Sequence, residues 1–181
     1  MNQPDQFEAV VREYYQPLFR FALSLTRAES DAWDLTQHTF YVWAKKGHQL
    51  RDAAKVQSWL FTTLHRAFLV ARKRQTKFSE DPLEDVLLEL PVLSSETSDE
   101  RDYSKVLPAL AKVDEVYQAA VALYYLQKCS YNDITRILGV PLGTVKSRIA
   151  RGIAQLRELL HPNEDDPSPP PRAAPWDLIP N

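Results

Sequence analysis

Basic and hydroxyl side chains are concentrated in the run LGTVKSRIARGIAQLR, residues 142–157, which has four basic residues and no acidic one. Arg and Lys can hydrogen-bond guanine edges in the major groove or pair with phosphates. Apolar residues recur in the same run at three- and four-residue steps, so a helix would place the polar residues on the opposite face. The run therefore predicts a DNA-reading helix with these candidate contacts: Thr144, Lys146, Ser147, Arg148 and Arg151.

The residues before this run predict the first helix of a helix-turn-helix. Ile134, Ile137 and Leu138 form a short apolar face, and Gly139 permits the left-handed turn that ends a helix. Pro141 suits the first turn of the next helix. In a helix-turn-helix, this second helix enters the major groove of DNA. The expected buried stripe of that helix is Val145, Ile149, Gly152, Ile153 and Leu156. The alternative interpretation is a helical hairpin with a solvated basic face.

A second basic set belongs to a helix predicted over residues 56–74 and to the loop before it, residues 45–55. The apolar face of this helix is predicted to be Val56, Leu60, Thr63, Leu64, Ala67, Phe68 and Ala71. The set consists of His48, Arg51, His65, Arg66, Arg72, Lys73 and Arg74. On its own, a basic set at the end of a helix is more often a solvated helix end than a DNA site.

Two more helices are predicted in the first 47 residues. Apolar residues recur from Phe7 to Leu25, and Pro17 should kink this helix or start a new one. The next helix is expected to open with Ser30 as its N-cap and to end at Gly47. Asp34, Gln37 and His38 would lie within one turn of each other on its exposed side.

The charge pattern divides the 181-residue chain into four blocks. Formal charge is +4 over residues 1–75, −6 over 76–105, +3 over 106–160 and −3 over 161–181. Two basic blocks separated by an acidic one predict two nucleic-acid-binding domains on a linker, followed by a proline-rich tail.

Composition excludes several other classes of protein. The 4 glycines argue against a sandwich or barrel and against a glycine-rich phosphate loop. Cys129 is the single cysteine and is expected to be a small buried hydrophobe. No zinc spacing and no nucleophile–base pair is found, so no cofactor, metal or enzymatic activity is predicted. Without a long apolar run or a signal-peptide pattern, a cytoplasmic location with no membrane contact is expected.

The run GTVKSRIARGIAQLREL, residues 143–159, resembles the promoter-reading helix of extracytoplasmic-function sigma factors, the subunits that direct bacterial RNA polymerase to promoters. The preceding SYNDITRILGVP is similar to the family's Ser-Tyr-x-Glu-Ile-Ala-x-x-Leu-Gly-Val-Pro, with Asp133 in place of Glu and Thr135 in place of Ala. The resemblance implies that the candidate residues of this helix contact the minus-thirty-five element.

The stretch DAWDLTQHTFYVWAKK, residues 31–46, resembles the family segment that docks on the coiled-coil clamp of the largest polymerase subunit. The resemblance implies these polymerase contacts: Asp34, Gln37, His38 and Phe40. Trp33 and His38 stand where the family usually has glutamates. Either the clamp contact is weaker here, or Trp33 replaces charge with apolar area.

The helix SWLFTTLHRAFLVARKRQ, residues 58–75, resembles the family's minus-ten segment. Trp59 and Leu60 match it, as do the three basic residues near its end. Arg66 replaces the usual Asn and Val70 the usual Asp, so base recognition is not carried over at those positions. In the family, the loop corresponding to residues 45–55 captures a flipped base. The resemblance implies that the basic set of this loop and helix contacts a melted DNA strand, which requires a cationic track and a pocket for an extruded base.

The expected fold is all-α, with two small helical domains over residues 1–75 and 106–160, an acidic flexible linker over 76–105 and a tail over 161–181. The expected partners are core RNA polymerase, promoter DNA and an anti-sigma factor or other regulator. Two alternatives stay open: a helix-turn-helix regulator that acts as a dimer, and an interaction protein such as an anti-sigma antagonist. In the tail, Trp176–Ile179 could be a docking motif or part of a solvated end.

Overall fold

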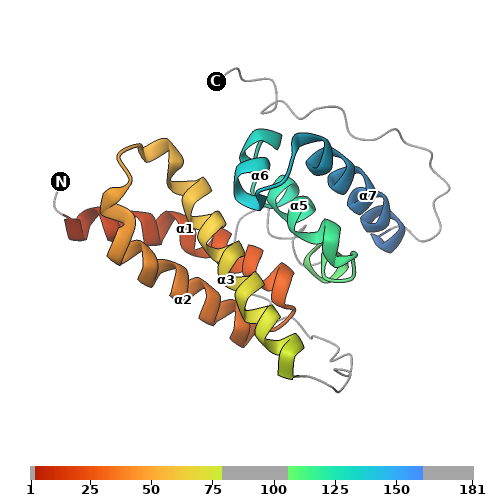
Figure 1. The fold of residues 1–181 in the computed structure, drawn as a ribbon, viewed down its shortest axis with the longest axis horizontal. Helices are drawn as coiled ribbons and strands as arrows, with labels where there is room; N and C mark the ends of the chain where they lie inside the picture. The colour runs from red at the N-terminus through yellow and green to blue at the C-terminus, as the bar shows by residue number, and fades with distance from the viewer. Residues whose placement is uncertain (1–2, 79–105, 161–181) are drawn as a thin grey trace. The chain divides into compact units, whose positions relative to one another are not determined.

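The computed structural model describes residues 3–78 and 106–160, and every regular element assigned in these ranges is a helix. The chain divides into two compact units, residues 1–88 and 89–181 (Figure 1). The predicted all-α architecture with two helical domains is therefore confirmed. The predicted linker begins inside a helix, because residues 76–78 are still helical. The rest of the linker and the tail, with its Trp176–Ile179 cluster, lie outside the described residues.

Unit 1 contains three long helices, α1 (Gln3–Thr26), α2 (Glu29–Lys46) and α3 (Val56–Phe78), each in contact with the other two. Its core includes Leu18, Phe21, Leu60, Phe61 and Leu64, all fully buried. The Phe21 and Phe61 rings meet edge to face, with centroids 5.4 Å apart. Burial of each such side chain contributes about 1.5–3 kcal/mol, so α1 and α3 are joined mainly by apolar packing.

The start of α2 differs from the prediction. Ser30 is not its N-cap, because α2 begins at Glu29 after an Ala28 that makes no side-chain cap bond. Arg27 has a left-handed backbone (φ 60°) and its N–H donates to the Leu23 carbonyl, so the chain leaves α1 and turns before reaching Ser30. The Thr26 hydroxyl donates to the Ala28 carbonyl at 2.9 Å and fixes this turn.

Pro17 lies inside α1, which continues through it as one helix, so no new helix starts there. A proline in a helix interior removes one hydrogen bond and crowds the preceding turn, at a cost of about 3 kcal/mol. The next residues, Leu18 and Phe19, are buried in the unit 1 core, and their packing offsets this cost.

The connection from α2 to α3 is compact and begins at Gly47. Two short 3₁₀ turns, η1 (Gly47–Gln49) and η2 (Ala53–Lys55), make up most of it. A Cβ atom at Gly47 would lie 2.6 Å from Trp43 Cδ2, so only glycine permits this approach. The Trp43 ring in turn meets Trp59 of α3 edge to face at 5.2 Å. The aromatic pair therefore holds the base of the loop.

Unit 2 contains α5 (Glu115–Tyr125), α6 (Tyr131–Leu138) and α7 (Leu142–Leu160), which pack on one another after a helical segment over residues 106–110. Gln118, almost fully buried, donates its side-chain N–H to the Leu110 carbonyl at 3.0 Å. Gln155 of α7 bonds both the backbone N–H and the carboxylate of Asp114. These bonds tie α7 and the residues before α5 together. Among the residues described, no helix has the length and apolar character needed to cross a membrane.

Candidate functional site

The α6–turn–α7 segment has the predicted helix-turn-helix geometry. The Ser130 hydroxyl caps α6, accepting from the Asp133 N–H at 3.1 Å and donating to the Asp133 carboxylate at 2.6 Å. Gly139 ends α6 with a left-handed backbone (φ 66°), as predicted, and its N–H donates to the Thr135 carbonyl. The Pro141 carbonyl accepts the first bond of α7. Backbone bonds at both ends of the turn therefore fix the angle at which α7 is presented.

The face of α7 opposite its core side is polar and basic. The predicted buried stripe is confirmed: Val145, Ile149, Gly152, Ile153 and Leu156 are all buried. Thr144, Ser147, Arg148 and Arg151 follow the spacing i, i+3, i+4, i+7, so they lie along the other side of the helix. We call these four residues the α7 outer face. Ser147 and Arg151 are exposed, while Thr144 and Arg148 are half-buried.

Lys146 is also exposed, but its spacing places it about 100° around the helix from Ser147, on the opposite flank of α7 from Arg148. The Ser147 hydroxyl donates to the Thr144 carbonyl one turn earlier, at 3.0 Å. It remains at the surface, where it can exchange this bond for one to a phosphate. The structure thus brings four of the five predicted α7 contacts into one row and leaves Lys146 outside it, on the other flank of the helix.

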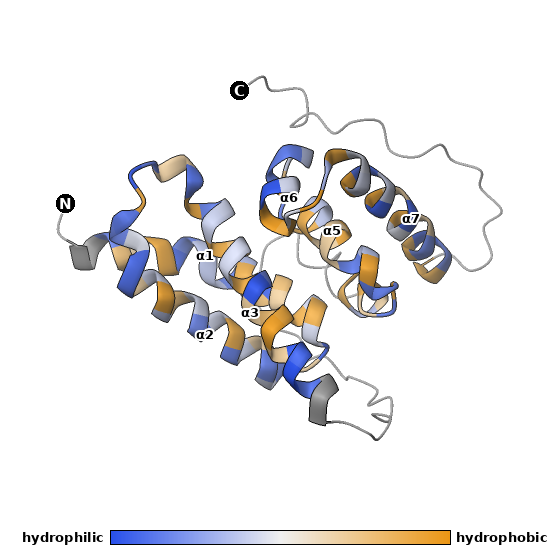
Figure 2. Ribbon diagram, viewed as in Figure 1, coloured by the Kyte–Doolittle hydropathy of each residue, from blue (hydrophilic) through white to orange (hydrophobic). Residues whose placement is uncertain are grey.

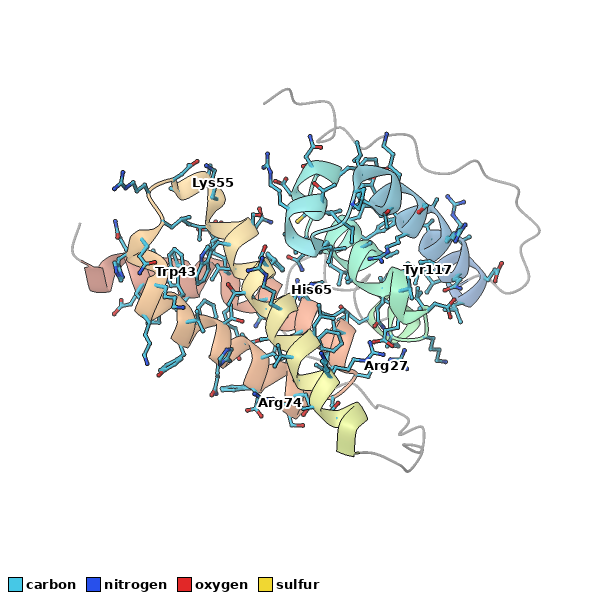
Figure 3. The ribbon with its side chains drawn as sticks, viewed as in Figure 1. Arg27, Trp43, Lys55, His65, Arg74 and Tyr117 are labelled. Atoms are coloured by element: carbon cyan, nitrogen blue, oxygen red, sulfur yellow. The ribbon has the colours of Figure 1, made fainter. Side chains whose placement is uncertain are left out.

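The predicted minus-ten residues do not form one cluster. His48 and Arg51 are exposed in the α2–α3 loop, whereas the other five lie along α3. From Val56, where the loop ends and α3 begins, to Lys73 the helix extends about 25 Å along its axis, at 1.5 Å per residue. In Figure 3, Lys55 marks the loop, His65 the middle of α3 and Arg74 its far part. The predicted minus-ten residues therefore form an extended row along the loop and α3, which we call the α3 track.

Along α3, the basic residues differ in orientation. Helical spacing places Arg66 and Lys73 opposite the buried side, and both are exposed. His65 and Arg72, seven residues apart and both half-buried, share one flank. Arg74, on the other flank, is exposed. A ligand that follows the outer side of α3 would therefore meet Arg66 and Lys73 first.

Two exposed apolar residues on this outer side were not predicted as part of the site. Leu69 is 48% exposed and Val70 is 52% exposed. They lie three and four residues after Arg66, and the same distances before Lys73. Their spacing can be read from the sequence, but only the structure shows that both residues lie on the exposed side of α3.

The exposed side of α2 presents the polar residues predicted for polymerase binding. Asp34, Gln37 and His38 are all exposed and share one face of the helix. Phe40 is a correction: it is 7% exposed and stacks on Tyr15 with centroids 6.5 Å apart, so it supports this surface from the core and cannot be a direct contact.

Trp33 extends the same α2 surface with apolar area. It is 44% exposed, and its ring meets Tyr15 edge to face at 6.3 Å. Tyr15 is thus in contact with both Trp33 at the surface and Phe40 in the core. This arrangement holds a large aromatic ring in place next to Asp34.

The described residues contain no group of three or more His, Cys, Asp or Glu side chains that could hold a metal ion. Cys129 is 4% exposed, as expected for a small buried hydrophobe, and its burial raises the pKa of the thiol to about 12. The thiol is therefore protonated at neutral pH.

Comparison with protein families gives two matches in the order of the two units. Residues 10–78 match Sigma-70 region 2, and residues 104–156 match Sigma-70, region 4. Both the α2 surface and the α3 track fall in the first match, and the α7 outer face falls in the second.

Curated relatives agree with both matches along most of the chain. The ECF RNA polymerase sigma factor SigM of Mycobacterium tuberculosis is 34% identical over 154 residues, which is 85% of this chain and 76% of that protein. SigE of Mycolicibacterium smegmatis, also described as an ECF RNA polymerase sigma factor, is 32% identical over 158 residues, 85% of this chain. The chain spans 61% of the length of SigE.

Solved structures that are similar to this chain include those of RpoE and CnrH. The sigma factor RpoE of Bartonella quintana, solved in complex with the anti-sigma factor NepR, has a TM-score of 0.67 at 27% identity and covers 84% of this chain and 97% of its own. CnrH, solved with the cytosolic domain of CnrY, has a TM-score of 0.60 at 20% identity and covers 90% of this chain and 92% of its own. The likeness to CnrH shows the fold.

Proposed function

The chain belongs to the extracytoplasmic-function sigma factors of bacterial RNA polymerase, and on that premise we propose that it binds core polymerase and directs it to promoters. Sigma factors are non-enzymatic, and the chemistry of transcription belongs to polymerase. In this proposal unit 1 contacts polymerase and the melted minus-ten region, while unit 2 reads the minus-thirty-five duplex.

The observation that carries the proposal is the α7 outer face. A helix-turn-helix presents its second helix to the major groove, where Arg and Lys pair with guanine edges or phosphates. Arg148 and Arg151 lie on the side of α7 that faces away from its core, and residues 142–157 contain no acid that would neutralise them. The same row carries Thr144 and Ser147, which can bind phosphate oxygens.

For unit 1, the proposal assigns the two surfaces different ligands. The exposed α2 side, with Asp34, Gln37 and His38, is proposed to dock on the clamp of the largest polymerase subunit. The α2–α3 loop and α3 are proposed to follow the melted strand. Residues 53–78 contain six basic residues and no acidic one, which supports an anionic ligand for α3.

A dimeric helix-turn-helix regulator is less well supported. Such a regulator needs a second copy of unit 2 at one helical-turn spacing, and it has no use for a region 2 domain. Unit 1 supplies that domain over residues 10–78. We further propose an anti-sigma protein as a regulator, because RpoE and CnrH have been solved in complex with NepR and with CnrY.

The test is gel filtration of the full chain with core RNA polymerase, followed by transcription from a library of genomic fragments. A sigma factor co-elutes with core and starts transcription at defined sites that core alone does not use. Elution apart from core as a dimer, with retention of duplex binding, would instead support the regulator.

A further inference from the structure

The outer side of α3 combines charge and apolar area in one row. Arg66, Leu69, Val70 and Lys73 follow the spacing i, i+3, i+4, i+7, directly opposite the buried Leu60 and Leu64. We call these four residues the α3 outer stripe. About half of the Leu69 and Val70 side chains is exposed, and a cation stands one turn away on either side. Figure 2 shows that the stretch of α3 that contains Leu69 and Val70 is hydrophobic and lies between two hydrophilic stretches of the helix.

The positive charge around the α3 outer stripe indicates what kind of partner the stripe can bind. Residues 53–78 have no acidic residue, so an acidic polymer meets no repulsion along α3. A polymer with regularly spaced phosphates could pair with Arg66 at one end of the stripe and Lys73 at the other, about 10 Å apart along the helix. Between these charges Leu69 and Val70 offer only apolar surface. A single DNA strand, whose bases are unstacked and reachable, matches both parts.

The apolar pair also limits which bases can be favoured. Leu and Val side chains can neither donate nor accept a hydrogen bond, so they cannot read the polar edge of a base. They can contact the C5-methyl group that thymine carries and the other bases lack. In the family resemblance, Val70 stands where an Asp is usual, so the base preference here should differ in kind.

We propose that the α3 outer stripe binds the melted promoter strand and that Leu69 and Val70 favour thymine through its methyl group. The proposal rests on the assignment of α3 to the melted strand. It goes further by naming the residues that determine specificity and the base that they select.

The experiment compares two fluorescent oligonucleotides of about 12 nucleotides, one of thymidine and one of deoxyuridine, which differ only in the C5-methyl groups. Binding is followed by fluorescence anisotropy with the full chain alone and in complex with core polymerase, with core alone as the baseline. The wild-type chain is expected to bind oligothymidine more tightly by about fourfold for each methyl group buried. The Leu69→Ala/Val70→Ala variant should bind both oligonucleotides equally.

Three further variants separate a base contact from other effects. Val70→Ile keeps an apolar side chain and should retain the thymine preference. Arg66→Ala should weaken binding to both oligonucleotides alike and reduce the salt dependence, since it removes a phosphate contact. Val116→Ala changes a side chain in unit 2 that is 60% exposed, and should leave binding unchanged.

Equal binding of the two oligonucleotides by the wild-type chain would overturn the proposal. So would an unchanged thymine preference in the double variant, or no binding of either oligonucleotide with or without core. A failure of the sigma assignment gives a different result, because the wild-type chain would then elute apart from core polymerase in gel filtration.

Discussion

Two glycines of α7 have different surroundings, and alanine should affect them differently. A Cβ atom at Gly152 would lie 2.4 Å from Val121 Cγ2 and 2.9 Å from Tyr117 Cβ, whereas nothing lies within 4 Å at Gly143. We expect Gly152→Ala to destabilise unit 2 by about 1–3 kcal/mol through overpacking. Gly143→Ala, the matched control, should be neutral or stabilise by up to about 1 kcal/mol. Calorimetry of the full chain measures both, and an unchanged transition for Gly152→Ala would contradict the packing.

Trp33 is expected to decide how the α2 surface binds polymerase. A tryptophan near the centre of an interface is often a binding hot spot, and Trp33 is adjacent to Asp34, so Trp33→Ala is expected to weaken core binding by about 2 kcal/mol or more. Leu159→Ala, at an exposed apolar residue of unit 2, is the control.

The variant Trp33→Glu, which introduces the residue usual in the family, separates the two interpretations of this position. Weaker core binding than wild type means that apolar area has replaced charge in the contact. Tighter binding means that the natural contact is the weakened one. Titration of labelled core polymerase with each variant gives the affinities.

At the residue scale, the sequence predicted side chains well wherever one face of a helix decides their environment. The α7 stripe from Val145 to Leu156 is buried as expected because α7 packs on its neighbours along a single face. Phe40 and Ser30 were wrong for different reasons. Phe40 lies at the side of α2 that meets Tyr15, a contact between helices that periodicity does not locate. Ser30 lost its cap role because the left-handed Arg27 moves the turn toward the N-terminus.

At the scale of one element, α7 is expected to act as the reading helix. Arg148→Ala and Arg151→Ala should each weaken binding to the minus-thirty-five duplex, by roughly 1–3 kcal/mol where the arginine makes a bidentate base contact. Lys112→Ala, which removes an exposed charge outside α7, is the control. Electrophoretic mobility shifts with a duplex selected by the full chain measure the effect. Loss of core binding in either arginine variant would contradict the proposal that unit 1 binds polymerase and unit 2 reads the minus-thirty-five duplex.

Element ends and wide buried faces were harder to predict than element types. Phe61 is fully buried although it lies off the predicted apolar face of α3, because α1 and α2 both pack on α3 and together cover more of its circumference. Ala71 was expected in that face but is exposed, and α3 itself continues to Phe78. The burial of residues on α3 thus depends on the neighbouring helices that pack on it, and the apolar pattern of α3 alone does not show where they pack.

At the scale of the whole molecule, the two units should be separable in function. Asp34→Lys reverses a charge at the centre of the proposed clamp surface and is expected to abolish co-elution with core polymerase. The same full-length variant should bind a minus-thirty-five duplex as wild type does, since the α7 outer face belongs to the other unit. Asp31→Lys, at an exposed acid one turn earlier on α2, tests whether position matters beyond charge. Normal transcription with Asp34→Lys would place the polymerase contact elsewhere.

The raised pKa of Cys129 predicts how unit 2 responds to alkaline pH. Burial raises the thiol pKa from 9.0 to about 12, so above pH 9 the unfolded chain loses this proton while the folded unit keeps it. Stability should therefore fall as the pH rises from about 9 toward 12. Cys129→Ala should remove this part of the pH dependence, which denaturant unfolding at several pH values would show. An identical alkaline decline in both proteins would assign it to other groups.

The burial of this single thiol also provides a way to measure how often unit 2 opens. A thiol reagent can modify Cys129 only when unit 2 opens, so the rate of modification reports the opening free energy of that unit. Trp33, Trp43 and Trp59 all lie in unit 1, and with Trp176 replaced by phenylalanine their fluorescence reports unit 1 alone. Added polymerase or DNA should slow the opening of whichever unit it binds. One solution would then show, ligand by ligand, which half of the chain has been engaged.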